Sequence, residues 1–502
     1  MLESSFVPLL VAIPLLGAFV IPLLSKLWEG FADLVGNLVS VFLLGLAVYG
    51  LVHLSTGATG IVYKMGGWLP PIGITLVYDS LTALVVLITN LVVFPALLFS
   101  TRYLDQYTGR WKYYTLFMLL LAGLNGVAIS GDLFNMFVFI EISAVASYAL
   151  VAFGTRAEEL EAGFKYMVMG EVGGLAILLS VALLYAKTST LNLADMSQSL
   201  AAGGHTTFFW FALGTILVGF AIKMAMVPFH SWLPDAYLSA PAPVTAVLAG
   251  VFSKVVGVYA MSRVVFNLFG LSRTTAPAFF DMLVAFGLVS IVAGGLLAIN
   301  QRNYKRLLAY SSVSQMGYIL VGFGIGNYWG VVGALFLVVA HAATKGLLFL
   351  SARSIERSTG TRDIDSIGGL EKSMPVTAWS YILGSMSLAG IPPFAGFFAK
   401  LLIVLGAVAS RMYWLAILAA LFSTVTLGYL MKVIGKVFVG RKSTEPTPAQ
   451  ESPPMILLAL VILVVVVVLF GIGFQPVLDW VVQPAAEALF GGLAYARLVF
   501  GG

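Results

Sequence analysis

The sequence predicts an all-α polytopic membrane protein, and three observations lead to that fold class. Of the 502 residues, 60% are hydrophobic and only 10% are charged, whereas soluble domains carry about 25% charged residues. Apolar stretches long enough for a bilayer span, which needs roughly 20 residues, recur along the whole chain. These stretches are continuous rather than alternating, which excludes a barrel of short strands.

Apolar stretches bounded by charges or by Gly/Pro clusters predict fourteen transmembrane helices. The expected spans are residues 6–24, 34–54, 75–99, 114–130, 133–153, 164–186, 208–229, 244–267, 278–298, 307–325, 329–352, 376–408, 412–439 and 455–473. The first stretch lacks the basic segment of a cleaved signal peptide, so we expect it to be a retained helix. No polar segment is large enough for a soluble active site, and we expect no enzymatic centre in this chain.

The spans fall into four consecutive regions. Residues 1–110 contain helices 1–3, residues 111–270 contain helices 4–8, residues 271–440 contain helices 9–13, and residues 441–502 contain a Pro/Ser/Thr-rich linker, helix 14 and a tail. Each five-helix set has a proline-broken helix in fourth place. An odd number of spans reverses the orientation of the second set, so we expect two inverted repeats.

The basic residues predict the orientation in the membrane. With the N-terminus outside, the inner loops carry 17 of the 27 Lys and Arg residues, and the outer loops with the tail carry 6. The positive-inside rule therefore places both termini outside and the 353–375 loop inside.

The remaining four basic residues, Lys223, Lys254, Lys345 and Lys400, lie near the middle of apolar spans, as does Glu141. A charge at the bilayer centre costs about 2.5–3.5 kcal/mol. Snorkelling to the membrane surface suits lysines near helix ends, but Lys223 has fifteen residues of its span before it. These charges are therefore candidate functional residues.

Lysine and glutamate in this setting are suited to a proton path. Desolvation lowers the pKa of a lysine and raises that of a glutamate, so both can titrate near neutral pH. His341 lies one helical turn before Lys345 and can share a proton with it, although an interhelical hydrogen bond is the structural alternative. Asp79, Glu171 and His230 are secondary candidates.

Two predicted spans are interrupted by proline close to a buried lysine. Pro228 follows Lys223, and Pro392 and Pro393 precede Lys400. Proline frees a carbonyl of the preceding turn, which a membrane tolerates only where the freed group meets protein or water. A simple kink is the alternative, but broken helices in corresponding places of two halves indicate an ion path.

Several other kinds of chemistry are not supported. The chain has no cysteine, which excludes disulfides, iron–sulfur clusters and thiolate metal sites within it. No GxxxxGK[ST] phosphate loop is present, so the chain itself has no ATP drive. No His/Asp/Glu cluster has the spacing of metal ligands. We expect no cofactor, no bound metal and no nucleic-acid partner, since basic residues in a membrane protein are mostly topology signals.

Long motifs surround the buried charges. Glu141 lies in GDLFNMFVFIEISAVASY, and Lys223 and Lys254 lie in the block that begins VGFAIKMAMVPFHSWLPDAY. The second half contains YKRLLAYSSVSQMGYI, HAATKGLLFL and SLAGIPPFAGFFAK. These motifs resemble the antiporter-like subunits of respiratory complex I, Mrp-type multisubunit Na⁺/H⁺ antiporters and membrane-bound hydrogenases, and the resemblance covers essentially the whole chain.

The resemblance implies a subunit that translocates protons, or exchanges a cation for protons, in a multisubunit complex of the cytoplasmic membrane of a prokaryote. The motifs look most like the Mrp D-type protein and its hydrogenase counterpart. PFHSWLPDAY is instead similar to complex I, which leaves redox-driven pumping as the alternative. The implied partners are further membrane subunits, including at least one other antiporter-like subunit, together with the lipid bilayer, H⁺ and Na⁺.

The resemblance also implies an order of roles. Glu141 couples to the pathway of the neighbouring subunit, and Lys223 is its switchable partner. Lys400 is the terminal exchange site. Three groups carry protons between these ends along the middle of the membrane: Lys254, His341 and Lys345.

Two unrelated functions remain open at this point. A solute carrier needs a polar cavity shaped for its substrate, whereas the buried polar groups here are mostly titratable. The other is a structural membrane scaffold with no transport role, which would be supported if neutralising Glu141 left pumping intact.

Overall fold

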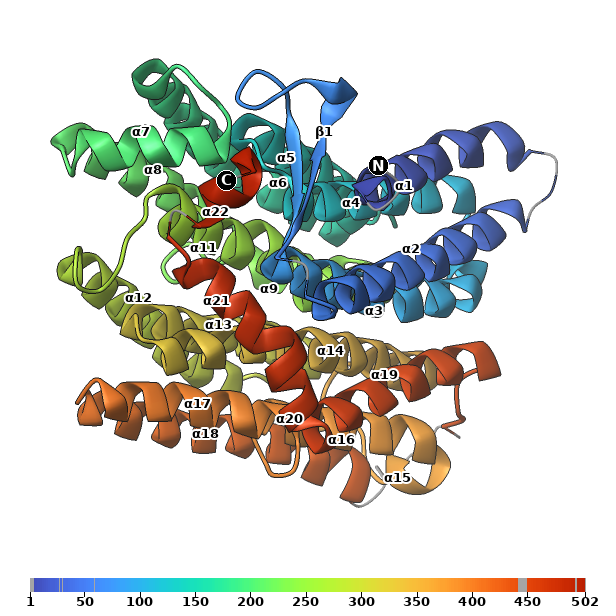
Figure 1. Ribbon diagram of the computed structural model, residues 1–502. Coiled ribbons are helices and arrows are strands. Elements are labelled where there is room, and N and C mark those ends of the chain that lie inside the picture. Colours follow the sequence, from blue (N-terminus) through green and yellow to red (C-terminus); the bar gives the residue numbers. More distant parts are fainter. Residues whose placement is uncertain are drawn as a thin grey trace.

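The computed structural model describes residues 4–26, 28, 30–57, 59–440, 449–492 and 494–501 (Figure 1). Within these ranges the chain is almost entirely helical, and twelve helices are long and apolar enough to cross a membrane. Two further crossings are the broken helices expected from the sequence. The chain is therefore an all-α polytopic membrane protein, as predicted.

The unbroken crossings are straightforward to delimit. In the first half they are α1 (Phe6–Leu24), α2 (Phe31–Ser55), α3 (Ser80–Tyr103), α4 (Arg110–Ile129), α5 (Leu133–Val151), α6 (Ala157–Thr188) and the span Ala242–Leu268, which comprises α10 (Ala242–Val247), η4 (Leu248–Tyr259), α11 (Ala260–Ser262) and η5 (Arg263–Leu268). In the second half they are α12 (Pro277–Ile299), α13 (Tyr304–Ile325), α14 (Tyr328–Thr359), α18 (Tyr413–Val433) continued by η6 (Ile434–Val439), and α19 (Pro454–Ile472).

The two broken crossings are each made of two separate helices. The first consists of α8 (Thr207–Lys223) and α9 (Trp232–Ser239), and the second of α16 (Pro375–Ala389) and α17 (Ala395–Ala409). Ala225 follows α8 with a φ of 56°, a left-handed conformation that residues with a side chain adopt at a cost. Gly390 ends α16 with a φ of 85°, which glycine adopts freely.

Shorter elements lie outside the crossings. They are the antiparallel strands β1 (Ile61–Lys64) and β2 (Thr75–Tyr78), the short helices η2 (Met65–Gly67), η3 (Leu104–Gln106), α7 (Leu193–Gly203) and α15 (Leu370–Ser373), and, after α19, α20 (Phe474–Val477), η7 (Leu478–Val482), α21 (Gln483–Phe490) and α22 (Ala494–Phe500). None of these was expected from the sequence. The predicted linker at 441–454 falls partly outside the described residues, and its described stretch, 449–453, is not helical.

The third crossing begins five residues later than expected, and its cap explains the difference. Residues 75–78 pair with β1 instead of joining the helix. Asp79 then accepts a hydrogen bond from the backbone N–H of Thr82 at 2.9 Å, which fixes the start of α3 at Ser80.

The connecting segments separate onto two sides of the bundle. On the hairpin side, which carries β1 and β2, Leu76 pairs with Ser130, and Asn267 donates to the carbonyl of Ala488 at 3.0 Å. On the opposite side, Asn303 pairs with Asp363 of the 353–375 segment. Successive connections alternate between the two sides, as a chain that crosses a membrane repeatedly requires.

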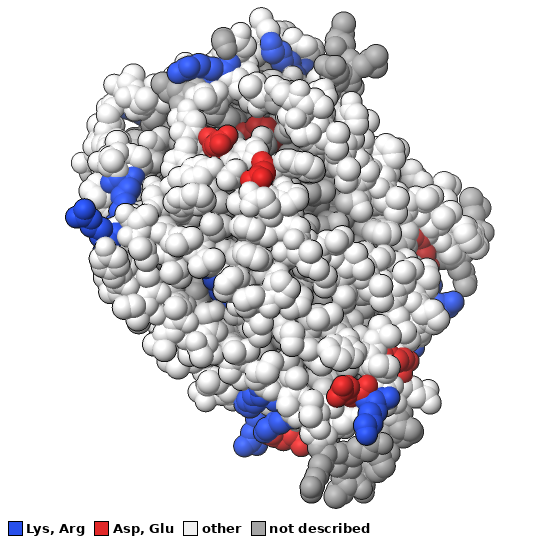
Figure 2. All heavy atoms as spheres, turned by 60° about the horizontal axis from the view of Figure 1, so that its bottom comes forward, with Lys and Arg blue, Asp and Glu red and all other residues white. Residues whose placement is uncertain are grey.

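The crossings differ in how deeply they are buried. The most apolar stretches of α14 and of the span Ala242–Leu268 are fully buried, whereas most of the corresponding residues in α1, α2 and α19 face outward. Figure 2 shows charged residues gathered mainly toward the margins of one face, with a broad area of other residues between them. The fully buried central crossings carry Lys254, His341 and Lys345.

The segment after α19 crosses the outside of the bundle. Figure 1 shows α21 running obliquely from the end of α19 toward α22, which lies near α7. Along this course α21 packs on α3, α14 and η5. The C-terminal segment thereby joins helices of both halves on the hairpin side.

Candidate functional site

Glu141 and Lys223 form an ion pair at the first helix break. Lys223 is the last residue of α8, and its Nζ lies 3.0 Å from Oε1 of Glu141 on α5. The hydroxyl of Tyr148, two helical turns after Glu141, lies 3.4 Å from the same Nζ. Lys223 is 2% exposed, whereas the Glu141 side chain is 20% exposed. The pair therefore connects the interior of the bundle with its surface.

At the break, backbone N–H groups bond the last carbonyls of α8, since Ala225 donates to Ile222 at 3.1 Å and Met226 to Ala221 at 3.0 Å, and one side chain adds a further bond. Trp232, the first residue of α9, donates its indole N–H to the carbonyl of Ile222 at 3.0 Å. A membrane offers no water to such groups, so this bond stabilises the interrupted backbone. The interrupted backbone is thus stabilised by specific contacts, and the break places Lys223 at the end of a helix.

Glycines of α6 make room for this pair. A Cβ placed on Gly174 would lie 2.5 Å from Oε1 of Glu141, and one placed on Gly170 would lie 2.0 Å from the hydroxyl of Tyr148. Both polar groups therefore rest directly on the α6 backbone. Glu171 lies on the same helix, close enough to Glu141 and Lys223 to interact electrostatically with both.

Lys254 lies in the middle of the fully buried span Ala242–Leu268. It is 1% exposed, donates to the carbonyl of Ala249 and lies 3.3 Å from the hydroxyl of Ser253. This stretch of the span has π-helical turns, which often accompany functional sites in helices. Among the described residues, no carboxylate forms an ion pair with Lys254.

His341 and Lys345 share one face of α14 but do not bond to each other. Lys345 donates to the carbonyl of Leu308 at 2.7 Å and to the hydroxyl of Ser311 at 2.5 Å. Both ring nitrogens of His341 are buried and lack a hydrogen-bond partner among the described residues. The expected direct proton exchange between the two residues has no hydrogen bond to carry it in this conformation.

His341 is nevertheless near enough to lysines of both halves to be influenced by their charges. It interacts electrostatically with Lys254, Lys345 and Lys400, and Lys254 also interacts with Lys345. A buried imidazole with two free nitrogens in such surroundings can accept a proton or a water molecule. The arrangement links the first-half lysine with those of the second half.

The second helix break holds Lys400 with the carbonyls that it exposes. Lys400 donates to the carbonyls of Leu388 and Ala389, the last residues of α16, at 2.9 and 3.2 Å. The hydroxyl of Ser423 on α18 lies 3.3 Å from the same Nζ. The end of α16 thus supplies Lys400 with two backbone acceptors that a helix C-terminus leaves without intrahelical partners.

Two secondary candidates lie apart from these groups. Asp79 forms a buried ion pair with Arg263, which also donates to Asn267 at 3.1 Å. Arg263 lies inside the predicted span 244–267 and is 2% exposed, but its position in the sequence did not single it out among the buried charges. His230 follows the first break, and its Nδ1 has no partner among the described residues. No hydrogen bond or ion pair in the described chain joins Asp79 or His230 to the buried lysines.

Sequence reasoning missed the neutral groups that surround the charges. Tyr148 lies seven residues after Glu141, a spacing that places both on one face of α5, so a signal for it was available. Ser311, Ser423 and Gly174 are ordinary residues in apolar helices, and no local pattern marks them. Their roles depend on contacts between segments far apart in the sequence.

The chain is similar to known membrane proteins over most of its length. Residues 130–426 match the family described as NADH:quinone oxidoreductase/Mrp antiporter, TM. The chain is 35% identical to NADH-quinone oxidoreductase subunit N of Desulforudis audaxviator, over 84% of this chain and 87% of that protein. It is 32% identical to the D component of the Na(+)/H(+) antiporter of Alkalihalophilus pseudofirmus, over 93% of this chain and 92% of that protein.

Two solved structures are similar over nearly the full length. A chain of the Mrp complex from Dietzia sp. superposes with a TM-score of 0.92 at 28% identity, covering 100% of both chains. A chain of the membrane-bound sulfane sulfur reductase, an archaeal respiratory membrane complex, superposes with a TM-score of 0.91 at 30% identity, covering 99% of this chain and 100% of that one.

Proposed function

Because the chain belongs to the NADH:quinone oxidoreductase/Mrp antiporter transmembrane family, we propose that it is a proton-translocating subunit of a multisubunit membrane complex. The observation that carries this proposal is the Glu141–Lys223 pair, 3.0 Å apart, at the end of a broken transmembrane helix. An intramembrane ion pair is costly to maintain and marks a functional site by default. Further buried lysines come after this pair in the chain, the last of them at the second break.

The proton path would run between the two breaks. Opening of the ion pair removes the carboxylate that stabilises the charged form of Lys223, so the lysine can release its proton; closing restores the charge. The proton then moves through three central groups to Lys400 at the second break: Lys254, His341 and Lys345. Water molecules would bridge the gaps, because no side-chain hydrogen bonds between these groups are present among the described residues.

The two halves of the chain would act as related channels. Residues 111–270 and 271–440 would form inverted five-helix repeats, between an N-terminal region (residues 1–110) and a C-terminal region (residues 441–502). Supporting this proposal, α8/α9 and α16/α17 are each the fourth crossing of five, and each break holds a buried lysine. Each half would contribute one half-channel, with His341 near their junction.

Within its complex, the chain would have the role of an Mrp D-type subunit, which would exchange Na⁺ for H⁺. Full-length similarity to both an Mrp complex and a respiratory complex keeps redox-driven pumping as a second candidate. The protein would reside in the cytoplasmic membrane of a prokaryote with both termini outside. Co-purifying subunits separate the two roles, since an oxidoreductase module implies redox drive.

The proposed function is tested by neutralising the acid of the ion pair. Glu141→Gln, expressed with its partner subunits, should assemble normally but abolish proton movement measured with a pH-sensitive dye in inverted membrane vesicles. Glu371→Gln, at an exposed glutamate of the 353–375 segment, serves as the matched control. Normal proton movement by Glu141→Gln would contradict the proposal.

A further inference from the structure

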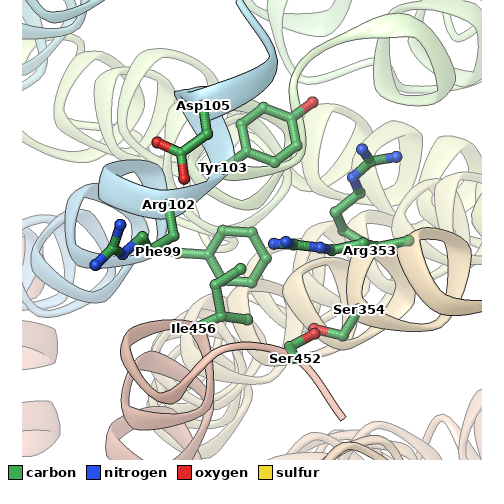
Figure 3. Close-up of a pocket in the computed structure, with 9 residues that line it drawn as sticks. Phe99, Arg102, Tyr103, Asp105, Arg353, Ser354, Ser452 and Ile456 are labelled. Carbon is green, nitrogen blue, oxygen red and sulfur yellow. The ribbon is translucent and has the colours of Figure 1, made fainter. Parts of the chain in front are cut away.

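A small cavity lies where three crossings end on the side of the 353–375 segment. It encloses about 120 Å³ between the last turns of α3, the last turns of α14 and the start of α19. Figure 3 shows side chains from these three segments surrounding one space. None of the groups in the proposed proton path lines this cavity.

The charge around the cavity is predominantly positive. Arg102, Arg353 and Arg357 line it, together with one acid, Asp105. Asp105 forms an ion pair with Arg110. Among the described residues, neither Arg102 nor Arg357 is paired with a carboxylate, and both are exposed. Two guanidinium groups are thus available to an anion.

The third arginine forms the inner wall. Arg353 lies 3.2 Å from Glu356 and stacks over the ring of Tyr103 at 5.1 Å, so its guanidinium is held in place. Two buried serines, Ser354 and Ser452, also line the cavity, and the hydroxyl of Ser354 donates to the carbonyl of Leu350 at 3.4 Å. Guanidinium groups, together with the hydroxyl of Ser452, around one space match the oxygen atoms of a phosphate group.

The size and depth of the cavity restrict the ligand further. Pockets for whole drug-sized molecules enclose roughly 300–1,000 Å³, so this cavity admits only a small group. Phe99 and Ile456 supply an apolar wall, each 1% exposed. The cavity lies at the ends of helices that cross the membrane, which is the depth of lipid headgroups. Basic pockets between transmembrane helices bind anionic headgroups in this position.

We propose that this cavity binds the phosphate group of an anionic phospholipid, with Arg102, Arg353 and Arg357 as its cationic contacts. The acyl chains would lie outside the cavity, along the apolar surface of the bundle. A bound lipid would bridge α3, α14 and α19, which belong to the N-terminal, second-repeat and C-terminal regions of the chain. The site is independent of the proposed proton path.

The test measures lipid retention by the purified full-length protein in its complex. Nanodiscs containing equal amounts of phosphatidylglycerol and phosphatidylcholine are used, and the retained lipids are counted by native mass spectrometry. The double variant Arg102→Gln/Arg357→Gln should retain phosphatidylglycerol roughly 10- to 30-fold more weakly than the unmodified protein. Lys372→Gln, at an exposed lysine of the same side, should retain it normally. Both substituted arginines are exposed, so the variant should fold.

A second measurement separates the lipid from free phosphate. Inorganic phosphate is added to the protein in phosphatidylcholine nanodiscs, and the unfolding temperature is recorded. Selective retention of phosphatidylglycerol that the double variant loses supports the lipid site. Equal retention of both lipids, combined with stabilisation by inorganic phosphate, would overturn the lipid as ligand. Identical lipid retention by the double variant and the unmodified protein would overturn the site itself.

Discussion

Arginine and lysine should not be interchangeable at position 223. An arginine there can keep the ion pair with Glu141, which lies 3.0 Å from Lys223, but its guanidinium does not give up a proton in proteins. Lys223→Arg should therefore assemble normally and lose proton translocation, measured in inverted vesicles. Lys187→Arg, at an exposed lysine near the end of α6, should remain active. Near-normal activity of Lys223→Arg would show that the pair is only a structural salt bridge.

Gly174 should position the carboxylate of Glu141. A Cβ at this residue would approach Oε1 to 2.5 Å, so Gly174→Ala must displace the carboxylate from Lys223. A displacement of about 1 Å in a reacting group can reduce rates by about 100-fold, so we expect a loss of ~10- to 100-fold in transport. Gly214→Ala on α8 is the matched control, because nothing lies within 4 Å of its added Cβ.

A double variant distinguishes positioning from general damage. Glu141→Asp shortens the side chain by one methylene group and relieves the clash with Ala at position 174. The fold-loss of transport in the double variant Gly174→Ala/Glu141→Asp should therefore be smaller than the product of the fold-losses in the two single variants. Losses that simply multiply would indicate that Gly174 acts through the helix and not through Glu141.

At the residue scale, a site residue could be predicted from the sequence when its side chain is unusual for an apolar span. Charges such as Glu141 and Lys400 are conspicuous in apolar helices, because their burial is costly. Arg263 was not singled out because it lies near the end of a predicted span, where snorkelling is common, and its partner Asp79 is 184 residues away. Glycines and serines that support the charges cost nothing in a membrane helix, so they leave no signal.

At the scale of elements, hydropathy predicted the crossings well and the connections poorly. The broken helices could be anticipated, since proline interrupts the hydrogen-bond ladder wherever it occurs. The strands β1 and β2, each of four residues, and the short helices after α19 could not, because their pairing and packing arise from tertiary contacts. The π-helical turns around Lys254 likewise carry no sequence pattern that we could use.

Glu356 should stabilise the junction of α13, α14 and the 353–375 segment. Its carboxylate lies 3.0 Å from Lys305 and 3.2 Å from Arg353, and it also pairs with Arg362. Breaking a buried ion pair costs about 3–5 kcal/mol, because a charge is left without compensation. Glu356→Gln should therefore lower the unfolding temperature of the purified protein, recorded by intrinsic fluorescence in detergent. Glu371→Gln, which is exposed, should not, and an unchanged temperature for Glu356→Gln would refute this role.

At the scale of the whole molecule, the uneven distribution of basic residues predicts the orientation. The cysteine-free sequence makes single-cysteine labelling unambiguous. Ser366→Cys, exposed in the 353–375 segment, should react with a membrane-impermeant maleimide only after the cells are opened. Ile72 lies between β1 and β2 and is 85% exposed. Ile72→Cys should therefore react in intact cells. The reverse pattern would mean that both termini are inside.

The surface formed by α5 and α6 should be covered by another subunit. Phe164, Val172 and Leu175 of α6 are 63%, 52% and 64% exposed, which suits lipid equally well. Glu141 and Glu171 are also partly exposed, however, and a carboxylate facing lipid is costly. A protein neighbour with polar groups or water at this depth removes that cost. The entry to the path at Glu141 would then be shared between two chains.

Cross-linking within the complex tests this arrangement. Val172→Cys should cross-link to a neighbouring antiporter-like subunit. Leu38 on α2 is 59% exposed, and Leu38→Cys should react only with a lipid-soluble reagent. The shared entry also predicts that this polypeptide, reconstituted alone, lacks cation/proton exchange. Full exchange by the isolated chain would refute the requirement for a neighbour, because a complete path from Glu141 to Lys400 would then open to water on both sides within one subunit.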